Sequence, residues 1–159
     1  MSWTTDISDF LYRGWGDRAW VFKGSRCVEY RMESDTTGQG PDGIDRLWPG
    51  LGNTPFAEKI DAALHRGWGD RAWFFTGDQC AKYRMDSDRL DVGPIAIASQ
   101  WPGLRDTPFA QGIDAALYRG WGDRAWFFKA DQCVEYRMDD DTVSRTGAIA
   151  KYWSGLAGL

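Results

Sequence analysis

One segment of 26 residues occurs three times in this 159-residue chain, at intervals of 53 residues. Residues 60–85 read IDAALHRGWGDRAWFFTGDQCAKYRM and residues 113–138 read IDAALYRGWGDRAWFFKADQCVEYRM, which agree at 21 of 26 positions. Residues 7–32 agree with residues 113–138 at 19 of 26 positions. A shorter block follows each copy: LWPGL at 47–51, QWPGL at 100–104 and YWSGL at 152–156. Such repeats constrain the architecture, since each unit buries its apolar face against its neighbours.

Each copy predicts three strands and a terminal element. In the second copy, apolar residues 60–64 and aromatic residues 72–75 are separated by a Gly-Trp-Gly-Asp turn. Residues 80–85 alternate in polarity, so we expect a third strand with one apolar face. Residues 86–96 are acidic and contain Gly and Pro, and residues 95–101 predict a short helix or a fourth strand. This order is typical of a propeller blade.

The charge and the cysteines exclude several classes of protein. The net charge is −4 and the pI about 5.0, so a globally basic nucleic-acid binder is excluded. No apolar run approaches the ~20 residues that a membrane span needs. Cys27, Cys80 and Cys133 occupy equivalent places in the repeats, too far apart to form disulfides with one another, and we expect them to be reduced. Buried packing is one role for these thiols, and metal or redox chemistry is the other.

The repeat resembles a known family. The series IDAA, RAWFFKADQCVEYRMD and WPGL is similar to the hemopexin repeat, and the resemblance covers essentially the whole chain. It implies an all-β fold: a small hemopexin-like β-propeller of three blades, with blades at about 7–57, 60–110 and 113–159 of a single domain, 1–159. The family usually has four blades, so we expect the open edges to be covered by a second copy in a homo-oligomer. A β-trefoil is the alternative fold for three repeats of this length.

The resemblance also implies an ion in the central channel. The family's inner strands direct backbone carbonyl groups at a bound cation, and the corresponding residues here are Ser8, Asp61 and Asp114. Carbonyl oxygens suit a hard cation such as Ca²⁺ or Na⁺. The alternative is that these residues only pack the inner strands. Heme is not expected, because His65 is the only histidine and a pair of axial ligands would be needed.

A second candidate surface is the RGWGDRAW turn, which is identical in all three copies. Tryptophan and arginine on one rim of a propeller can stack planar or anionic ligands. The predicted ligand-binding residues are Trp15, Arg18, Trp68, Arg71, Trp121 and Arg124. Alternatively, the turn residues only brace the turn.

These observations favour a binding protein for a small molecule, an ion or a protein partner, acting through the channel or the Trp/Arg rim. One alternative is an enzyme, such as a cyclase or rearrangement catalyst, that acts by positioning its substrate. Another is a structural adaptor. No nucleic-acid or membrane partner is expected. The first ten residues, MSWTTDISDF, show no secretory signal, and we expect a bacterial, cytoplasmic protein.

Overall fold

Each repeat forms one antiparallel sheet in the computed structural model, which describes residues 2–12, 16–65, 70–119 and 122–159. The first sheet is followed by the helix α1 and two short 3-10 helices. Its elements are β1 (Asp9–Tyr12), β2 (Arg18–Lys23), β3 (Arg26–Arg31), β4 (Thr36–Thr37), β5 (Asp42–Gly43), α1 (Ile44–Leu47), η1 (Pro49–Leu51) and η2 (Pro55–Ala57). Both β4 and β5 pair with β3, so the outer strand of this sheet is in two pieces.

The second and third sheets have four strands each, in the order of the sequence. The second unit consists of β6 (Ala62–His65), β7 (Arg71–Thr76), β8 (Gln79–Arg84), β9 (Arg89–Ala96), α2 (Ile97–Gln100), η3 (Pro102–Leu104) and η4 (Pro108–Gln111). The third consists of β10 (Ala115–Tyr118), β11 (Arg124–Lys129), β12 (Gln132–Arg137), β13 (Thr142–Ala148), α3 (Ile149–Tyr152) and η5 (Ser154–Leu156).

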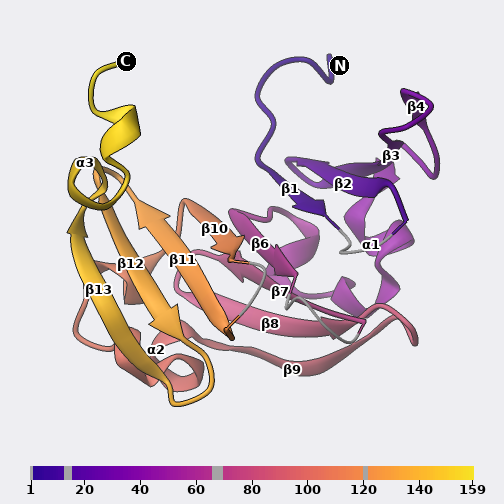
Figure 1. Cartoon of the computed structure of the whole chain (residues 1–159). Coiled ribbons are helices and arrows are strands. Elements are labelled where there is room, and N and C mark those ends of the chain that lie inside the picture. Colours follow the sequence, from indigo (N-terminus) through magenta and orange to yellow (C-terminus); the bar gives the residue numbers. More distant parts are fainter. Residues whose placement is uncertain (1, 13–15, 66–69, 120–121) are drawn as a thin grey trace.

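The three sheets are the blades of a propeller-like fold, with the first strand of each blade innermost (Figure 1). The inner strands β1 and β10 both contact β6. The first and third blades lie on opposite sides of the second, and Figure 1 shows an opening between them. Three separate sheets confirm the small all-β propeller and exclude the β-trefoil. The blade boundaries drawn from the sequence stay a prediction.

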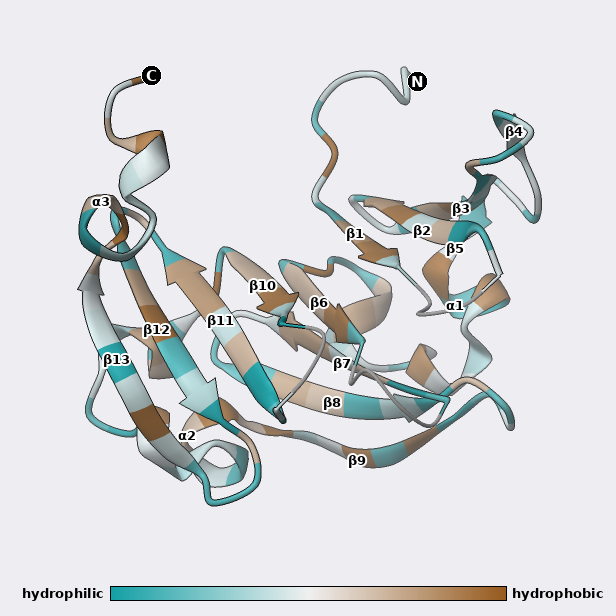
Figure 2. Ribbon diagram, in the orientation of Figure 1, coloured by the Kyte–Doolittle hydropathy of each residue, from teal (hydrophilic) through white to brown (hydrophobic). Residues whose placement is uncertain are grey.

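Two apolar clusters hold the blades together. One lies between the first two blades and includes Trp48 and Phe74, and the other lies between the second and third and includes Trp101 and Phe127. The rings of each pair meet edge to face, with centroids 5.3 Å and 5.2 Å apart. Figure 2 shows consecutive hydrophobic residues along the inner strands β6 and β10. Most of the core therefore lies between blades.

The middle blade corrects the expectation of one apolar face on the third strand. Ala81 and Tyr83 of β8 pack toward the first blade, whereas Cys80 belongs to the cluster shared with the third blade. All three side chains are fully buried. A blade with a neighbour on each side buries both faces, so polarity alternation along one strand does not reveal the second buried face.

Candidate functional site

The residue before each inner strand closes the turn between the next two strands. The Asp61 carboxylate accepts a hydrogen bond from the Gly77 N–H at 2.8 Å, and Asp114 accepts one from the Ala130 N–H at 2.7 Å. In the first blade the Ser8 hydroxyl accepts the equivalent bond from Gly24 at 3.3 Å. These three side chains thus have a structural role, which fixes their positions at one end of the inner strands.

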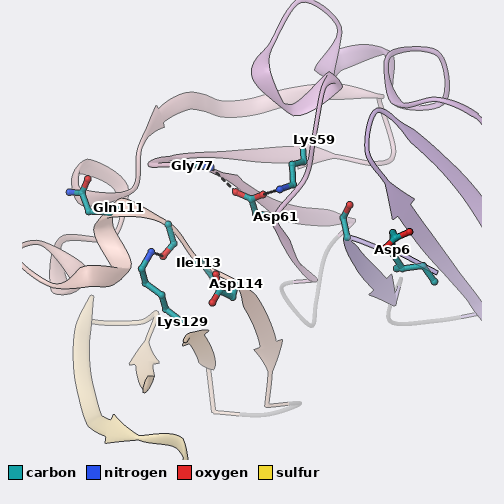
Figure 3. Close-up of a pocket in the computed structure, with 11 residues that line it drawn as sticks. Asp6, Lys59, Asp61, Gly77, Gln111, Ile113, Asp114 and Lys129 are labelled. Atoms are coloured by element: carbon teal, nitrogen blue, oxygen red, sulfur yellow. Dashed lines mark hydrogen bonds and ion pairs between the residues drawn. The ribbon is translucent and has the colours of Figure 1, made fainter. Parts of the chain in front are cut away.

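A cavity of about 620 Å³ opens at this end of the inner strands (Figure 3). We call it the axial pocket. It receives residues from all three repeats, and its lining consists of Asp6, Ile7, Ser8, Lys59, Asp61, Gly77, Gln111, Gly112, Ile113, Asp114 and Lys129. The predicted ion-binding residues Ser8, Asp61 and Asp114 therefore lie on one cavity.

The axial pocket contains more acid than base, and its lysines already have partners. Lys59 forms an ion pair with Asp61 at 3.3 Å, and Lys129 donates to the Gly112 carbonyl at 3.2 Å. Asp6 is largely exposed and lies 3.9 Å from Lys23. The lining has three carboxylates and two lysines, and Lys23 beside Asp6 offsets the third carboxylate.

The donor set of the axial pocket fits a cation only with the help of backbone oxygens. No group of three or more His, Cys, Asp or Glu side chains suited to a metal occurs among the described residues. The carboxylates of Asp61 and Asp114 can each contribute oxygen, and carbonyl groups are ligands that Ca²⁺ accepts. The carbonyl ligation predicted for Ser8, Asp61 and Asp114 stays a prediction.

Asp9 is a further acid on the inner strands that the sequence analysis did not single out. It stands where the other repeats have Ala62 and Ala115, and its carboxylate accepts a hydrogen bond from the Ala63 N–H of the second blade at 2.5 Å. Burial raises the pKa of Asp9 to about 7, although hydrogen bonds from the backbone of Phe10 and Ala63 oppose the shift. In the sequence, this acid could have been noticed because residues 7–10 read ISDF where the other two repeats read IDAA.

The three predicted rim arginines, Arg18, Arg71 and Arg124, begin the second strand of each blade, at the end of the sheets opposite the axial pocket. Trp15, Trp68 and Trp121 fall outside the described residues. Each rim arginine binds a carboxylate within its own blade: Arg18 to Glu29 at 3.4 Å, Arg71 to Asp91 at 3.2 Å and Arg124 to Glu135 at 3.3 Å. Glu29 and Glu135 lie on the third strands of their blades, β3 and β12, and Asp91 lies on the outer strand β9.

The cysteines are buried and free. Burial raises the pKa of the Cys27 and Cys80 thiols to about 12 and also raises that of Cys133. A thiol with a raised pKa is a poor nucleophile and a poor metal ligand at neutral pH. The structure therefore favours the packing role for all three. His65 ends β6, in the second blade.

Comparisons with known proteins identify the fold. No protein-family model matches the sequence. Albumin-2 of Pisum sativum is 28% identical over 153 residues, which cover 90% of this chain and 66% of the albumin. The chain thus spans about two thirds of the length of that relative. The crystal structure of the hemopexin fold protein CP4 from cow pea is 25% identical, with a TM-score of 0.87 over 96% of this chain and 72% of CP4. This chain is a hemopexin-fold protein.

Two further structures place this hemopexin-fold protein beside plant proteins. A 2S albumin seed protein from Dolichos is 26% identical, with a TM-score of 0.89 over 96% of this chain and 72% of the albumin. A Cicer arietinum lectin with two metal binding sites is 22% identical, with a TM-score of 0.85 over 91% of this chain and 69% of the lectin, and this likeness shows the fold alone.

The comparisons correct two predictions. The bacterial origin and the cytoplasmic location are both wrong, because the similar proteins found by sequence and by structure are plant albumins, among them a seed protein. The start of the sequence was the only ground for the location, and it does not decide where a protein resides. Within the described residues, none of the helices is long and apolar enough to cross a membrane.

Proposed function

We propose that this hemopexin-fold protein is a binding protein whose ligand is small and positively charged and occupies the axial pocket. The observation that carries the proposal is the convergence of all three repeats on one polar cavity. Its volume of about 620 Å³ lies within the range of about 300–1,000 Å³ that is usual for ligand sites.

The charges of the axial pocket favour a cation. Asp61 forms an ion pair with Lys59, whereas the Asp114 carboxylate has only the Ala130 N–H as a partner among the described residues. A cation placed between these carboxylates would gain from both, and the paired lysines would not need to move. A hydrated metal ion such as Ca²⁺ and an organic amine share this chemistry. The metal binding sites of the Cicer arietinum lectin support a metal ion as the ligand.

Thermal unfolding with two probes tests the proposal. Calcium chloride or spermidine is expected to raise the Tm of the wild-type protein, because a ligand that binds only the folded state stabilises it. Asp61→Asn and Asp114→Asn remove the charge but keep an oxygen for the turn N–H, so the folded state persists and the shift in Tm is lost. Asp45→Asn, an exposed acid of α1 outside the pocket, is the matched control and keeps the shift.

The two probes distinguish a metal ion from an organic amine as the ligand. A shift with calcium alone assigns a metal site, and a shift with spermidine alone assigns an amine site. No shift with either probe, or equal shifts in Asp45→Asn and in both pocket variants, contradicts the proposal.

A further inference from the structure

A small cavity lies at the contact between the first and second blades, beside a pair of tryptophans. Trp20 of β2 and Trp48 meet edge to face, with ring centroids 5.2 Å apart. We call this cavity of about 180 Å³ the Trp20 pocket, and its lining consists of Trp20, Gln39, Leu47, Trp48, Met85 and Asp88. Among the described residues it shares none of its lining with the axial pocket, so it is a separate cavity.

The contact between the second and third blades contains an equivalent cavity. Trp73 and Trp101 meet edge to face with centroids 5.2 Å apart, as their equivalents do 53 residues earlier. We call this cavity of about 120 Å³ the Trp73 pocket, and its lining consists of Trp73, Lys82, Gln100, Trp101, Met138 and Asp141. In both pockets the earlier blade contributes two tryptophans, and the later blade contributes a methionine and an aspartate.

In the Trp73 pocket the protein supplies its own cation. The Lys82 ammonium lies over the Trp73 ring, 5.6 Å from the ring centroid. A cation in this position is attracted by the negative face of the indole ring. Lys82 and Trp73 are directly opposite each other in the pair of strands β7 and β8, and Asp91 holds the ammonium at 3.3 Å. A tryptophan at this position of the blade therefore still offers one face to a cation.

The Trp20 pocket has no lysine at this position. Residue 29, directly opposite Trp20 in the pair of strands β2 and β3, is a glutamate. Gly38 stands where the second blade has Asp91, so the first blade lacks both members of the ion pair. The cavity beside Trp20 is also the larger of the two, at about 180 Å³ against about 120 Å³. The place that Lys82 fills in one pocket is thus left to an external cation in the other.

The lining of the Trp20 pocket favours a methylated ammonium ion over a primary one. A primary ammonium needs acceptors for three N–H groups, and the described side chains of the lining offer only those of Gln39 and Asp88. A quaternary ammonium has no N–H to satisfy, so burial against indole rings and the Met85 thioether costs it less. The exposed Asp88 carboxylate supplies an opposite charge.

Charge and size agree with this assignment. Glu29, on the same sheet face as Trp20, is 1% exposed and binds Arg18 at 3.4 Å, so its charge is already balanced within the blade. The carboxylate of Asp88 therefore gives the pocket a net negative charge. An apolar cavity of about 150 Å³ is large enough for a ligand of the size of benzene, so a trimethylammonium group fits the Trp20 pocket.

We propose that the Trp20 pocket binds the quaternary ammonium group of a small molecule of the choline type. The trimethylammonium group lies over the Trp20 ring, as the Lys82 ammonium lies over Trp73, with Met85 against its methyl groups and Asp88 as its counter-ion. This site is additional to the axial pocket and does not depend on the function proposed for that pocket.

Isothermal titration calorimetry with choline chloride tests the proposal. The wild type is expected to bind choline, and Asp88→Asn is expected to weaken binding about fivefold, since it removes the counter-ion. The neutral isostere of choline, in which a tert-butyl group replaces the trimethylammonium group, is expected to bind at least about tenfold more weakly. Asp114→Asn, which removes a carboxylate from the axial pocket, is expected to leave choline binding unchanged.

Exchanging residues between the blades gives the sharpest comparison. Glu29→Lys combined with Gly38→Asp gives the first blade the ion pair of the second, and choline binding is expected to be lost because the lysine covers the Trp20 ring. Conversely, Lys82→Gln uncovers the ring of Trp73 and is expected to add one choline site. Glu33→Gln, at an exposed position of the first blade, changes the net charge by the same single unit as the exchange and is the control that binds normally.

Circular dichroism verifies that each variant folds. The proposal is overturned if the wild type does not bind choline, or if the neutral isostere binds as tightly as choline. It is also overturned if choline binding survives the exchange but is lost in Asp114→Asn, because choline would then occupy the axial pocket. If the exchange variant does not fold, Lys82→Gln decides, and a number of choline sites equal to that of the wild type overturns the proposal.

Discussion

Trp101 and Trp153 occupy the same place in successive repeats, yet only one of them lies between two blades. Trp101 is 3% exposed and contacts Phe127 and Tyr136 of the next blade. The ring contacts of Trp153 among the described residues are with Trp126 and Phe128 of its own blade, both at 5.5 Å. The same residue of the repeat is thus packed between two blades or within one, depending on whether a blade follows it.

Replacing each tryptophan by alanine should give the largest difference between these two regions. Trp101→Ala removes a ring that fills the space between blades, and we expect a loss of about 3–5 kcal/mol in the free energy of unfolding. Trp153→Ala removes contacts within one blade only, and the loss should be less than half as large. Urea unfolding monitored by circular dichroism measures both values, at a concentration low enough to keep the chains monomeric. Equal losses would show that the end blade is as well packed as the middle one.

The glycine that follows each tryptophan by two positions makes a finer comparison. A methyl group on Gly103 would lie 2.8 Å from the Tyr136 ring and 2.9 Å from the Asp141 carbonyl oxygen, so Gly103→Ala must push the third blade away. We expect a loss of about 1–3 kcal/mol, as in other overpacked contacts. Gly155→Ala meets nothing and should leave the urea midpoint unchanged. A midpoint that falls equally in both variants would mean that backbone conformation, not the blade contact, requires the glycine.

The sequence predicts the blades well and the contacts between them poorly. Repetition and alternation place three strands in each copy, because both signals are local. For residues 95–101 the sequence left a helix and a strand open, and the structure has both: β9 ends at Ala96 and α2 begins at Ile97. The second buried face of β8 depends on the third blade, whose first strand begins at Ala115, 31 residues after β8 ends at Arg84, and no local sequence pattern reveals it.

Some residues of the candidate site could likewise be predicted from the sequence, whereas the surroundings of others could not. Ser8, Asp61 and Asp114 could be found from the sequence, since they recur at one position of the repeat, and the structure brings them to one cavity. Asp9 differs from the alanine of the other two repeats, which marks its position, but the burial of Asp9 and of Glu135 depends on distant residues and could not be predicted. Asp9 meets Ala63 of the next blade, and Glu135 is surrounded by arginines from three other strands or turns of its blade.

Asp9 distinguishes the contact of the first two inner strands from the contact of the second and third, where alanine stands. Its pKa is about 7 in the folded protein and near 4 in an unfolded chain. Between these values the folded state holds a proton that the unfolded state has lost, so this group makes stability fall as the pH rises from about 4 to about 7. Below and above this window its contribution is constant.

Asp9→Asn isolates this contribution, because the amide cannot ionise and its oxygen still accepts from Ala63. Urea midpoints of wild type and variant, measured from pH 4.5 to pH 8, should diverge as the pH rises, with the variant increasingly the more stable relative to wild type. A constant difference across this range would show that Asp9 ionises normally and that water reaches it.

The smallest expected effect concerns the turns below the axial pocket, where the first blade differs from the other two. Asp114→Ala removes the acceptor of the Ala130 N–H, and we expect a loss of about 1 kcal/mol, since the bond is charged but exposed. Ser8→Ala removes a longer bond from a neutral hydroxyl and should cost about 0.5 kcal/mol. The comparison separates the structural role of these residues from ligand binding: if Asp114→Asn restores the stability lost in Asp114→Ala but not the response to calcium or spermidine, the oxygen serves the turn and the charge serves the ligand. If the charge is also needed for the turn, Asp114→Asn will be as unstable as Asp114→Ala in the absence of any added cation.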